Sequence, residues 1–473
     1  MKCFLSIDCG LTKSKLAIFN HKGELLLENE MSTPLKGTLI NTAAFANAVT
    51  TMIYEAFING PVVAKDIMAV CVSGHGNGLY ILGDYGILPY AYSSMFTESQ
   101  DYIPDIESSF PINIQSSWSG QPLAILSYLY NREPAVFAKI RKVLFCKDLV
   151  KYILTGRVCT DYTDASAAGM LNYETGEYDK ELLKLYGLEE YTDLLPDLCR
   201  STDIIGTVSE SIAQKTGLLK NTPVIGGLFD VNSCMVGAGV INPDRYCIIS
   251  GTWGVNSAVV PQPLKIREIT QCCNFCYPDR FMCIDSAPTS CVNLEWFLKN
   301  VLHDISFEEA DYIVEKQPMN DKLFYFPYIY KPMDMNISGG FMGLSHDHDY
   351  KDMLRAVFEG IVFEHAYRIE KFKENGIVHD SAVLVGGASN SSVFCHMFAD
   401  CLGIKIYTTV RSQSGALGLA VMGAVASGVY PDLETAAKNM VAIKECYLPN
   451  PNISLKYKFK KFKKYLEAQQ SML

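Results

Sequence analysis

Residues 3–19 read CFLSIDCGLTKSKLAIF, two apolar runs on either side of a turn rich in small and hydroxylated residues. Residues 3–7 predict one buried strand and residues 15–19 a second. Residues 21–23, His-Lys-Gly, then indicate a turn before a third strand at residues 24–27. The chain is therefore expected to open with a β-meander.

A similar arrangement recurs near the middle of the chain. Residues 246–250 predict an apolar strand, residues 251–254 (GTWG) a turn, and residues 255–260 a returning strand. Two halves that open in the same way indicate a duplicated domain. We therefore expect a first domain over residues 1–243 and a second over residues 244–473.

Beyond each opening, strands alternate with helices, as in an α/β fold. The predicted elements are strands at 67–72, 223–225, 382–385 and 404–408, and helices at 231–240, 352–374 and 414–427, with one more helix that ends at Leu402 and has Gly403 as its C-terminal cap.

The composition restricts the class of protein. A chain of 473 residues with 49% hydrophobic and 19% charged residues fits a compact enzyme of two or three domains. A net charge of −10 provides no general attraction for nucleic acid or anionic membranes. Asp8 interrupts the first apolar run too early for a signal peptide, and no run reaches the roughly 18 apolar residues of a membrane span. We expect a cytoplasmic protein with 16 reduced cysteines.

Two turns carry groups that bind phosphates. Asp8 offers a carboxylate that can hold Mg²⁺ through water, and Gly10 allows close backbone approach. Thr12 adds a hydroxyl, and Lys15 follows on the next strand. Gly251-Thr252 offers a second set of amide and hydroxyl donors. Each turn taken alone also fits an ordinary hairpin.

Two further strand ends open into helices. Asp230 ends the stretch Gly226-Gly227-Leu228-Phe229, where it is either a helix N-cap or a general base for a substrate hydroxyl. Gly386-Gly387-Ala388-Ser389-Asn390 either holds a nucleotide or forms a tight turn, and it lacks the GxGxxG pattern of dinucleotide-binding folds.

Three stretches suggest other functions and have simpler explanations. Cys272, Cys273 and Cys276 lack the second half of a zinc motif. Residues 346–349 (HDHD) are expected to be loop or N-cap residues, and residues 456–464 to form a helix that buries its aromatic side chains while its lysines stay solvated.

Taken together and in this order, these motifs resemble the FGGY family of carbohydrate kinases over nearly the whole chain. Residues 339–344 (GGFMGL), then seven residues, then residues 352–359 (DMLRAVFE) match the long signature of the family's second half. The Asp8 turn resembles the first phosphate motif of the family, Gly251-Thr252 the second, and Gly386 to Asn390 the adenosine motif.

The resemblance implies two ribonuclease H-like domains of the actin and hexokinase type around a deep cleft. It implies that ATP binds mainly on the second domain and the sugar on the first, with Asp230 where the family places its catalytic base. Asp8 would hold Mg²⁺ through water, while Thr12 and Thr252 would steady the phosphates. We expect His75, Gly76 and Asn77 to contact the sugar, because imidazole and amide groups suit hydroxyls.

Within the family, several stretches are most similar to the L-xylulose kinase group, which implies L-xylulose or a related keto sugar such as 3-keto-L-gulonate as substrate. These stretches are residues 74–79, 118–122, 147–148, 154–156 and 160–166. Leu11 stands where the family has a hydroxyl residue, and Pro122 and Ile125 where it has Lys and Trp.

Three alternatives remain open: a kinase for D-xylulose, erythritol or another polyol, a catalytically weak sugar-binding relative, and an ATPase of this fold without a sugar substrate. The expected partners are ATP and a small sugar, with neither nucleic acid nor membrane, and the sequence leaves a homodimer open.

Overall fold

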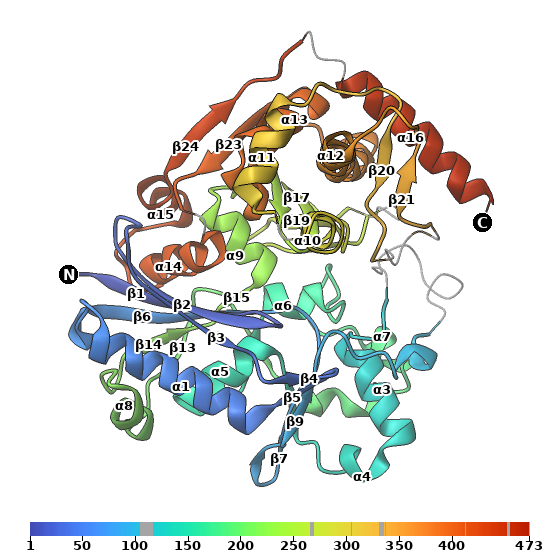
Figure 1. Cartoon of the computed structure of the whole chain (residues 1–473). Helices are drawn as coiled ribbons and strands as arrows, with labels where there is room; N and C mark the ends of the chain where they lie inside the picture. The colour runs from blue at the N-terminus through green and yellow to red at the C-terminus, as the bar shows by residue number, and fades with distance from the viewer. Residues whose placement is uncertain are drawn as a thin grey trace.

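The protein is described by a computed structural model with two α/β halves, shown in Figure 1. The structure describes residues 1–104, 117–264, 269–303, 305–330, 335, 337–411, 413–451 and 455–472. The first half, coloured blue to green, lies below the second half, coloured yellow to red, in the view of Figure 1. The α/β class expected from the sequence is confirmed.

The first half is built on a seven-stranded sheet with the order β13-β14-β6-β1-β2-β3, in which β15 also pairs with β6. Its strands are β1 (Cys3–Cys9), β2 (Lys13–Asn20), β3 (Leu25–Ser32), β6 (Ile67–Gly74), β13 (Ile204–Thr207), β14 (Pro223–Ile225) and β15 (Leu228–Phe229). β1, β2 and β3 form the predicted antiparallel meander, β6 and β14 add in parallel, and β13 closes the sheet antiparallel.

The second half repeats this pattern in a sheet with the order β18-β19-β17-β16-β22-β23-β24. Its strands are β16 (Tyr246–Ser250), β17 (Gly254–Val260), β18 (Gln271–Asn274), β19 (Phe281–Ala287), β22 (Ser381–Val385), β23 (Lys405–Thr409) and β24 (Ile443–Tyr447). β16, β17 and β19 are antiparallel, β22 and β23 add in parallel, and β24 is antiparallel. The shared opening of the two halves is therefore confirmed in the strand pairing.

Helices cover these sheets and connect their strands. They are α1 (Thr42–Asn59), α3 (Pro122–Arg132), α4 (Pro134–Phe137), α5 (Cys146–Thr155), α6 (Tyr162–Ala167), α7 (Lys180–Leu185), α8 (Glu210–Thr216), α9 (Asp230–Gly237), α10 (Cys291–Asn300), α11 (Phe307–Lys316), α12 (Tyr350–Glu374), α13 (Ser392–Leu402), α14 (Ser414–Ala426), α15 (Leu433–Met440) and α16 (Leu455–Met472). Short strands form small additional sheets: β4 (Leu35–Lys36), β5 (Leu39–Asn41), β7 (Tyr80–Gly83), β8 (Gly86–Ile87), β9 (Tyr90–Tyr92), β10 (Lys142–Leu144), β11 (Cys159–Asp161), β12 (Asp197–Cys199), β20 (Phe324–Phe326) and β21 (Gly340–Met342).

The predicted helix boundaries hold to within a few residues, and local chemistry explains the differences. α12 begins two residues before the predicted start because Asp349 and Asp352 form a capping box there. α9 ends before the predicted residue 240, since Gly239 adopts a positive φ of 73°. Pro122 occupies the first turn of α3, where a missing amide hydrogen costs nothing.

Helix α14 belongs to the second half of the chain but packs on strands β1 and β6 of the first sheet. It crosses α9 so closely that a Cβ on Gly237 would lie 1.8 Å from the carbonyl oxygen of Ser414. In Figure 1, α9 and α14 lie next to each other between the two sheets. These two helices therefore join the halves around one apolar core.

The C-terminal helix α16 docks as the sequence predicts, with two exceptions, Tyr457 and Lys458. Phe459 and Phe462 are buried against the second half, and Tyr457 is exposed. Lys458, expected to be solvated, is instead buried and forms an ion pair with Glu359 of α12. Among the helices in the described part of the chain, none is long and apolar enough to cross a membrane.

Candidate active site

Asp8 lies near the end of β1, beside two polar neighbours that strand pairing places there. Its partner in β2 is Lys15, and its partner in the parallel strand β6 is Ser73. The Ser73 hydroxyl donates to Oδ1 of Asp8 over 2.6 Å. Burial raises the pKa of Asp8, while the bond from Ser73 and the charge of Lys15 act in the opposite direction. A Cβ on Gly415 of α14 would lie only 2.9 Å from Oδ2 of Asp8.

The turn after Asp8 is tight. A Cβ on Gly10 would lie 2.5 Å from the carbonyl oxygen of Lys13, so only glycine fits the turn without displacement. Thr33 donates its hydroxyl to the carbonyl of Gly10 and its amide to the carbonyl of Thr12. The side chain of Thr12 itself is exposed. The backbone of the turn is therefore held by Thr33, while the Thr12 hydroxyl remains exposed and available to a ligand.

Asp230 is the first residue of α9, and Phe229 occupies the N-cap position. The alternative of Asp230 as an N-cap is therefore wrong. Its Oδ1 accepts a hydrogen bond from the amide of Val231 over 2.7 Å. Burial raises the pKa of Asp230 to about 7, with further contributions from the charges of Asp8 and Asp164. A carboxylate with this pKa can accept a proton near neutral pH.

His75 and Asn77 follow the end of β6, and the charge of His75 acts on the carboxylate of Asp230. The amide of His75 donates to the carbonyl of Cys9 over 2.7 Å, and its Nε2 lies 2.9 Å from the Tyr80 hydroxyl. Nδ1 of His75 and Oδ1 of Asn77 are buried without a hydrogen-bond partner in the described residues. Buried polar atoms without a protein partner are suited to bind a polar ligand.

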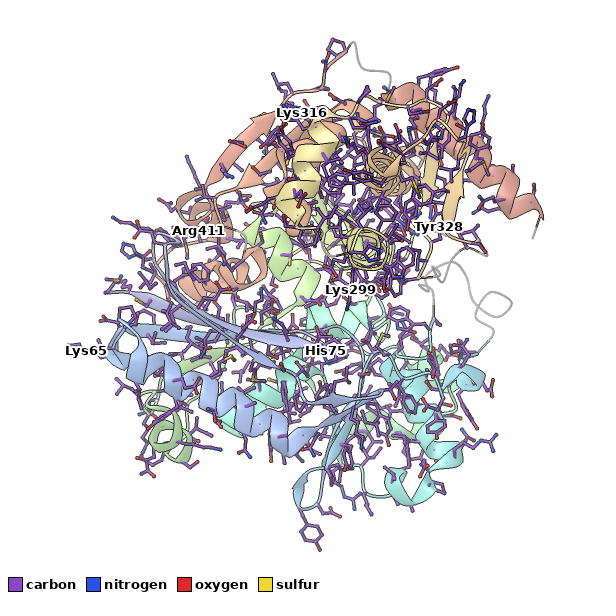
Figure 2. All side chains as sticks on the ribbon, viewed as in Figure 1. Lys65, His75, Lys299, Lys316, Tyr328 and Arg411 are labelled. Atoms are coloured by element: carbon purple, nitrogen blue, oxygen red, sulfur yellow. The ribbon has the colours of Figure 1, made fainter. Side chains whose placement is uncertain are left out.

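The backbone around His75 is constrained on both sides. Asn77 has a left-handed φ of 63°, and a Cβ on Gly76 would lie 2.3 Å from the ring of Phe229. Phe229 directly precedes Asp230, so Gly76 lets the two strand ends approach each other. Figure 2 shows His75 inside the molecule, near the junction of the two halves. The predicted sugar residues and the predicted base therefore come from adjacent strand ends, β6 and β15.

Near Asp230 is a cluster of five buried charged residues, Lys147, Lys151, Asp148, Asp161 and Asp164, of which Asp164 acts on Asp230 through its charge. Nζ of Lys147 lies 2.7 Å from Asp148, 3.1 Å from Asp161 and 2.8 Å from Asp164, and Nζ of Lys151 lies 2.9 Å from Asp148. This charge cluster contains three carboxylates and two ammonium groups. Burial raises the pKa of Asp164 to about 7, against the attraction of Lys147.

The charge cluster also holds the segment that carries Asp230. Lys151 donates to the carbonyl of Gly226 over 2.6 Å. Asp161 accepts a hydrogen bond from the Thr163 hydroxyl, whose oxygen accepts the amide of Phe229 over 2.9 Å. The backbone on both sides of the Gly226-to-Phe229 stretch is therefore anchored. Spacing alone did not reveal these contacts, although Lys147 and Lys151 lie one helical turn apart.

In the second half, the turn at residues 251–254 lies against the start of the predicted adenosine motif. Gly386 has a φ of 88°, and a Cβ there would lie 2.6 Å from the carbonyl oxygen of Ser250. Gly251 and Gly387 face open space, and Thr252 and Asn390 are exposed. Ala388 is buried, so its side chain contributes to packing. The two predicted nucleotide motifs of the second half are thus brought together.

The residues around Asp8 fit a magnesium ion. Mg²⁺ prefers oxygen ligands and is commonly held by one or two carboxylates together with phosphates and water. Ser73 occupies Oδ1 of Asp8, and Oδ2 accepts no hydrogen bond from the described residues. The described part of the chain contains no group of three or more His, Cys, Asp or Glu side chains that could hold a metal by themselves. A cation at Asp8 would therefore depend on ligands from a bound phosphate and from water.

Comparison with known proteins defines the class to which this fold and site belong. The model of the N-terminal domain of the FGGY family of carbohydrate kinases matches residues 3–237, and that of the C-terminal domain matches residues 308–427. The chain belongs to the FGGY family and is a carbohydrate kinase, a phosphotransferase.

Full-length relatives have similar sequences and folds. The chain is 26% identical to a probable L-xylulose kinase of Haemophilus influenzae, over 100% of both chains. It is 27% identical to the L-xylulose/3-keto-L-gulonate kinase of Escherichia coli, over 98% of this chain and 95% of that protein. The crystal structure of a ligand-bound xylulose kinase from Lactobacillus acidophilus matches with a TM-score of 0.91 and 22% identity, over 100% of this chain and 98% of that one. The predicted two-domain sugar-kinase fold is confirmed.

Proposed function

We propose that this carbohydrate kinase transfers the γ-phosphate of ATP to a hydroxyl of L-xylulose or a closely related keto sugar, with Asp230 as general base. The observation that supports the base assignment is the environment of Asp230, whose pKa of about 7 suits proton transfer near neutral pH. The names of the H. influenzae and E. coli relatives support the choice of sugar. A solved glycerol kinase of the same fold, from Plasmodium falciparum, contains ADP, which supports an adenine nucleotide.

In the proposed reaction, Asp230 removes the proton from a sugar hydroxyl as its oxygen bonds to the γ-phosphorus. The bond between that phosphorus and the oxygen bridging to ADP breaks, and the proton stays on Asp230 until it passes to solvent. His75 and Asn77 would orient the sugar through Nδ1 and Oδ1, for which the described residues provide no hydrogen-bond partner. This positioning lowers the entropic barrier to in-line attack.

The phosphates would lie between the two turns. Gly10, Thr12 and Lys15 would bind them from the first half, and Gly251 and Thr252 from the second. The adenosine would bind against Gly386, Gly387, Ala388 and Asn390. Mg²⁺, when bound, would neutralise charge on the phosphates, and Asp8 would hold it through water.

We also propose that the boundary between the two domains lies between residues 243 and 244.

The cellular setting is proposed from the cysteines. All 16 are present as thiols, several of them close enough to share hydrogen bonds, which fits the reducing cytoplasm.

Sedimentation of the purified protein would show whether it forms the homodimer that the sequence leaves open.

The substrate is tested by measuring ADP release with ketopentoses, keto-hexonates and polyols, including both L- and D-xylulose. We expect the highest kcat/KM with L-xylulose or a related keto sugar. A higher value for D-xylulose, erythritol or another polyol would instead support the second candidate, a kinase of different specificity. ADP release that no sugar stimulates would contradict the proposal.

The base is tested with Asp230→Asn. We expect this variant to bind ATP normally and to lose at least about 100-fold in sugar phosphorylation, since general bases typically contribute 10²–10⁴-fold. In the wild type, kcat/KM should rise as pH increases through about 7, because only ionised Asp230 accepts the proton. Near-normal turnover by Asp230→Asn would refute the assignment.

A further inference from the structure

A continuous chain of polar side chains lies beneath the turn at residues 251–254. The hydroxyl oxygens of Ser250 and Ser290 are 2.8 Å apart, and the Ser290 oxygen is 3.1 Å from Nε2 of His365. Nδ1 of His365 is 2.8 Å from Oδ1 of Asn256. All four side chains are buried, His365 with 2% of its surface exposed and the others with none. We call these four residues the hydroxyl–imidazole chain.

The bonds of the hydroxyl–imidazole chain have a defined direction. Oδ1 of Asn256 can only accept, so Nδ1 of His365 carries the ring hydrogen. Burial lowers the pKa of His365 to about 3, with help from the nearby charge of Arg368, so the ring is neutral at physiological pH. Nε2 therefore accepts the hydroxyl hydrogen of Ser290, and the Ser290 oxygen accepts that of Ser250. Each member fixes the orientation of the next.

The hydroxyl–imidazole chain joins four elements around the turn. Ser250 ends β16 immediately before the turn, and Asn256 lies in β17 after it. Ser290 is the residue before α10, and His365 lies in the middle of α12. The chain thus connects both strands of the hairpin to two helices of the same half.

The turn is also in direct contact with the imidazole. A Cβ on Gly254 would lie 3.1 Å from Cε1 and 3.2 Å from Nε2 of His365. The amide of Cys291 donates to the carbonyl of Gly251 over 2.9 Å, next to Ser290. Both ends of the turn are therefore held by α10 and by His365, while Thr252 between them remains exposed.

We propose that His365 is a positioning residue for nucleotide binding, which acts through Ser290 to hold the turn at residues 251–254 against the phosphates of ATP. It contacts neither the sugar nor the phosphates in this role. The inference rests on the proposed function, since it takes this turn as a phosphate-binding site. Loss of the chain should weaken binding of nucleotide, because the turn would lose its fixed orientation.

The test compares His365→Phe with the wild type by calorimetric titration of ADP and by steady-state kinetics. Phe fills the space of the imidazole and makes no hydrogen bond. We expect the Kd of ADP and the KM of ATP to rise about ten-fold, in line with the loss of one or two buried hydrogen bonds. The KM of the sugar and kcat should change by less than about two-fold, since the chain is expected to act on binding alone.

Two further variants separate positioning from general destabilisation. His365→Gln places an amide oxygen near the former Nε2, so it should restore part of the nucleotide affinity. Phe363→Leu removes packing of α12 against Phe459 and Phe462 of α16, away from the turn. It should lower the melting temperature while the KM of ATP stays at the wild-type value.

Unchanged Kd and KM for nucleotide in folded His365→Phe would overturn the inference. If that variant does not fold, Ser290→Ala, which removes one hydroxyl oxygen and adds no bulk, decides the question by the same two measurements. A wild-type protein that binds no ADP would refute the proposed function itself. The two failures are therefore distinguishable.

Discussion

Replacement of Asp230 by Asn should stabilise the folded protein above neutral pH while it removes most of the activity. The pKa of Asp230 is raised from the ordinary 3.8 to about 7 in the folded state. Between these two values the unfolded chain has lost a proton that the folded protein retains, so folding stability decreases as pH rises through this window. Above about pH 7 the wild type has lost the full amount of folding stability, and this amount no longer changes with pH. Asn carries no ionisable group and avoids the loss.

The magnitude follows from the difference between the two pKa values. That difference corresponds to about 4 kcal/mol, and because part of the Asp230 surface is exposed this is an upper limit. The side-chain amide of the variant still offers the amide of Val231 an oxygen acceptor in place of the carboxylate Oδ1. The gain should therefore approach a few kcal/mol at about pH 8 and be close to zero at about pH 4.

Urea unfolding of ligand-free wild type and Asp230→Asn, followed by fluorescence at several pH values, measures this gain. Asp193→Asn, at an exposed position, is the control and should unfold like the wild type throughout. The difference in the free energy of unfolding between Asp230→Asn and wild type should grow between about pH 4 and 7. If it does not, the pKa of Asp230 is not raised by its surroundings. A variant less stable than wild type at about pH 8 would refute the reasoning outright.

Three other substitutions test parts of the structure. Lys147→Met removes the ammonium group shared by three buried carboxylates and should cost roughly 3–5 kcal/mol in the free energy of unfolding, a value that denaturant titration would measure. Gly415→Ala places a methyl group 2.9 Å from Oδ2 of Asp8, and the Mg²⁺ concentration for half-maximal activity should rise about ten-fold in a metal titration. Lys458→Met breaks the buried ion pair with Glu359, and limited proteolysis should then release α16 at a lower protease concentration than in wild type.

Local patterns in the sequence predicted most of the secondary structure. The strands at residues 223–225 and 246–250 match the structure at both ends, and Gly403 caps α13 with a left-handed φ as expected. Asp349 caps α12, as predicted for the HDHD stretch. These features depend on residues within a few positions of one another, so turn chemistry and apolar periodicity are sufficient to find them.

Contacts between distant segments could not be predicted in this way. Ser73 meets Asp8 only because β1 and β6 pair in parallel in one particular register. Asp164, a member of the charge cluster, acts on Asp230 through its charge. The spacing of these residues in the sequence does not reveal this interaction. Lys458 lies on a lysine-rich helix that looks fully solvated, and its burial depends on Glu359, 99 residues earlier. Each such residue acquires its role from tertiary packing.

The packing of α14 on the first sheet has a consequence for synthesis of the protein in the cell. The faces of β1 and β6 that α14 covers remain without their apolar cover until the ribosome has made residue 426. The first half therefore cannot complete its core until late in translation, and a fragment that stops at residue 243 would expose that face to water. Truncated messages should yield protein that aggregates or is degraded, and the two halves should assemble only as one finished chain.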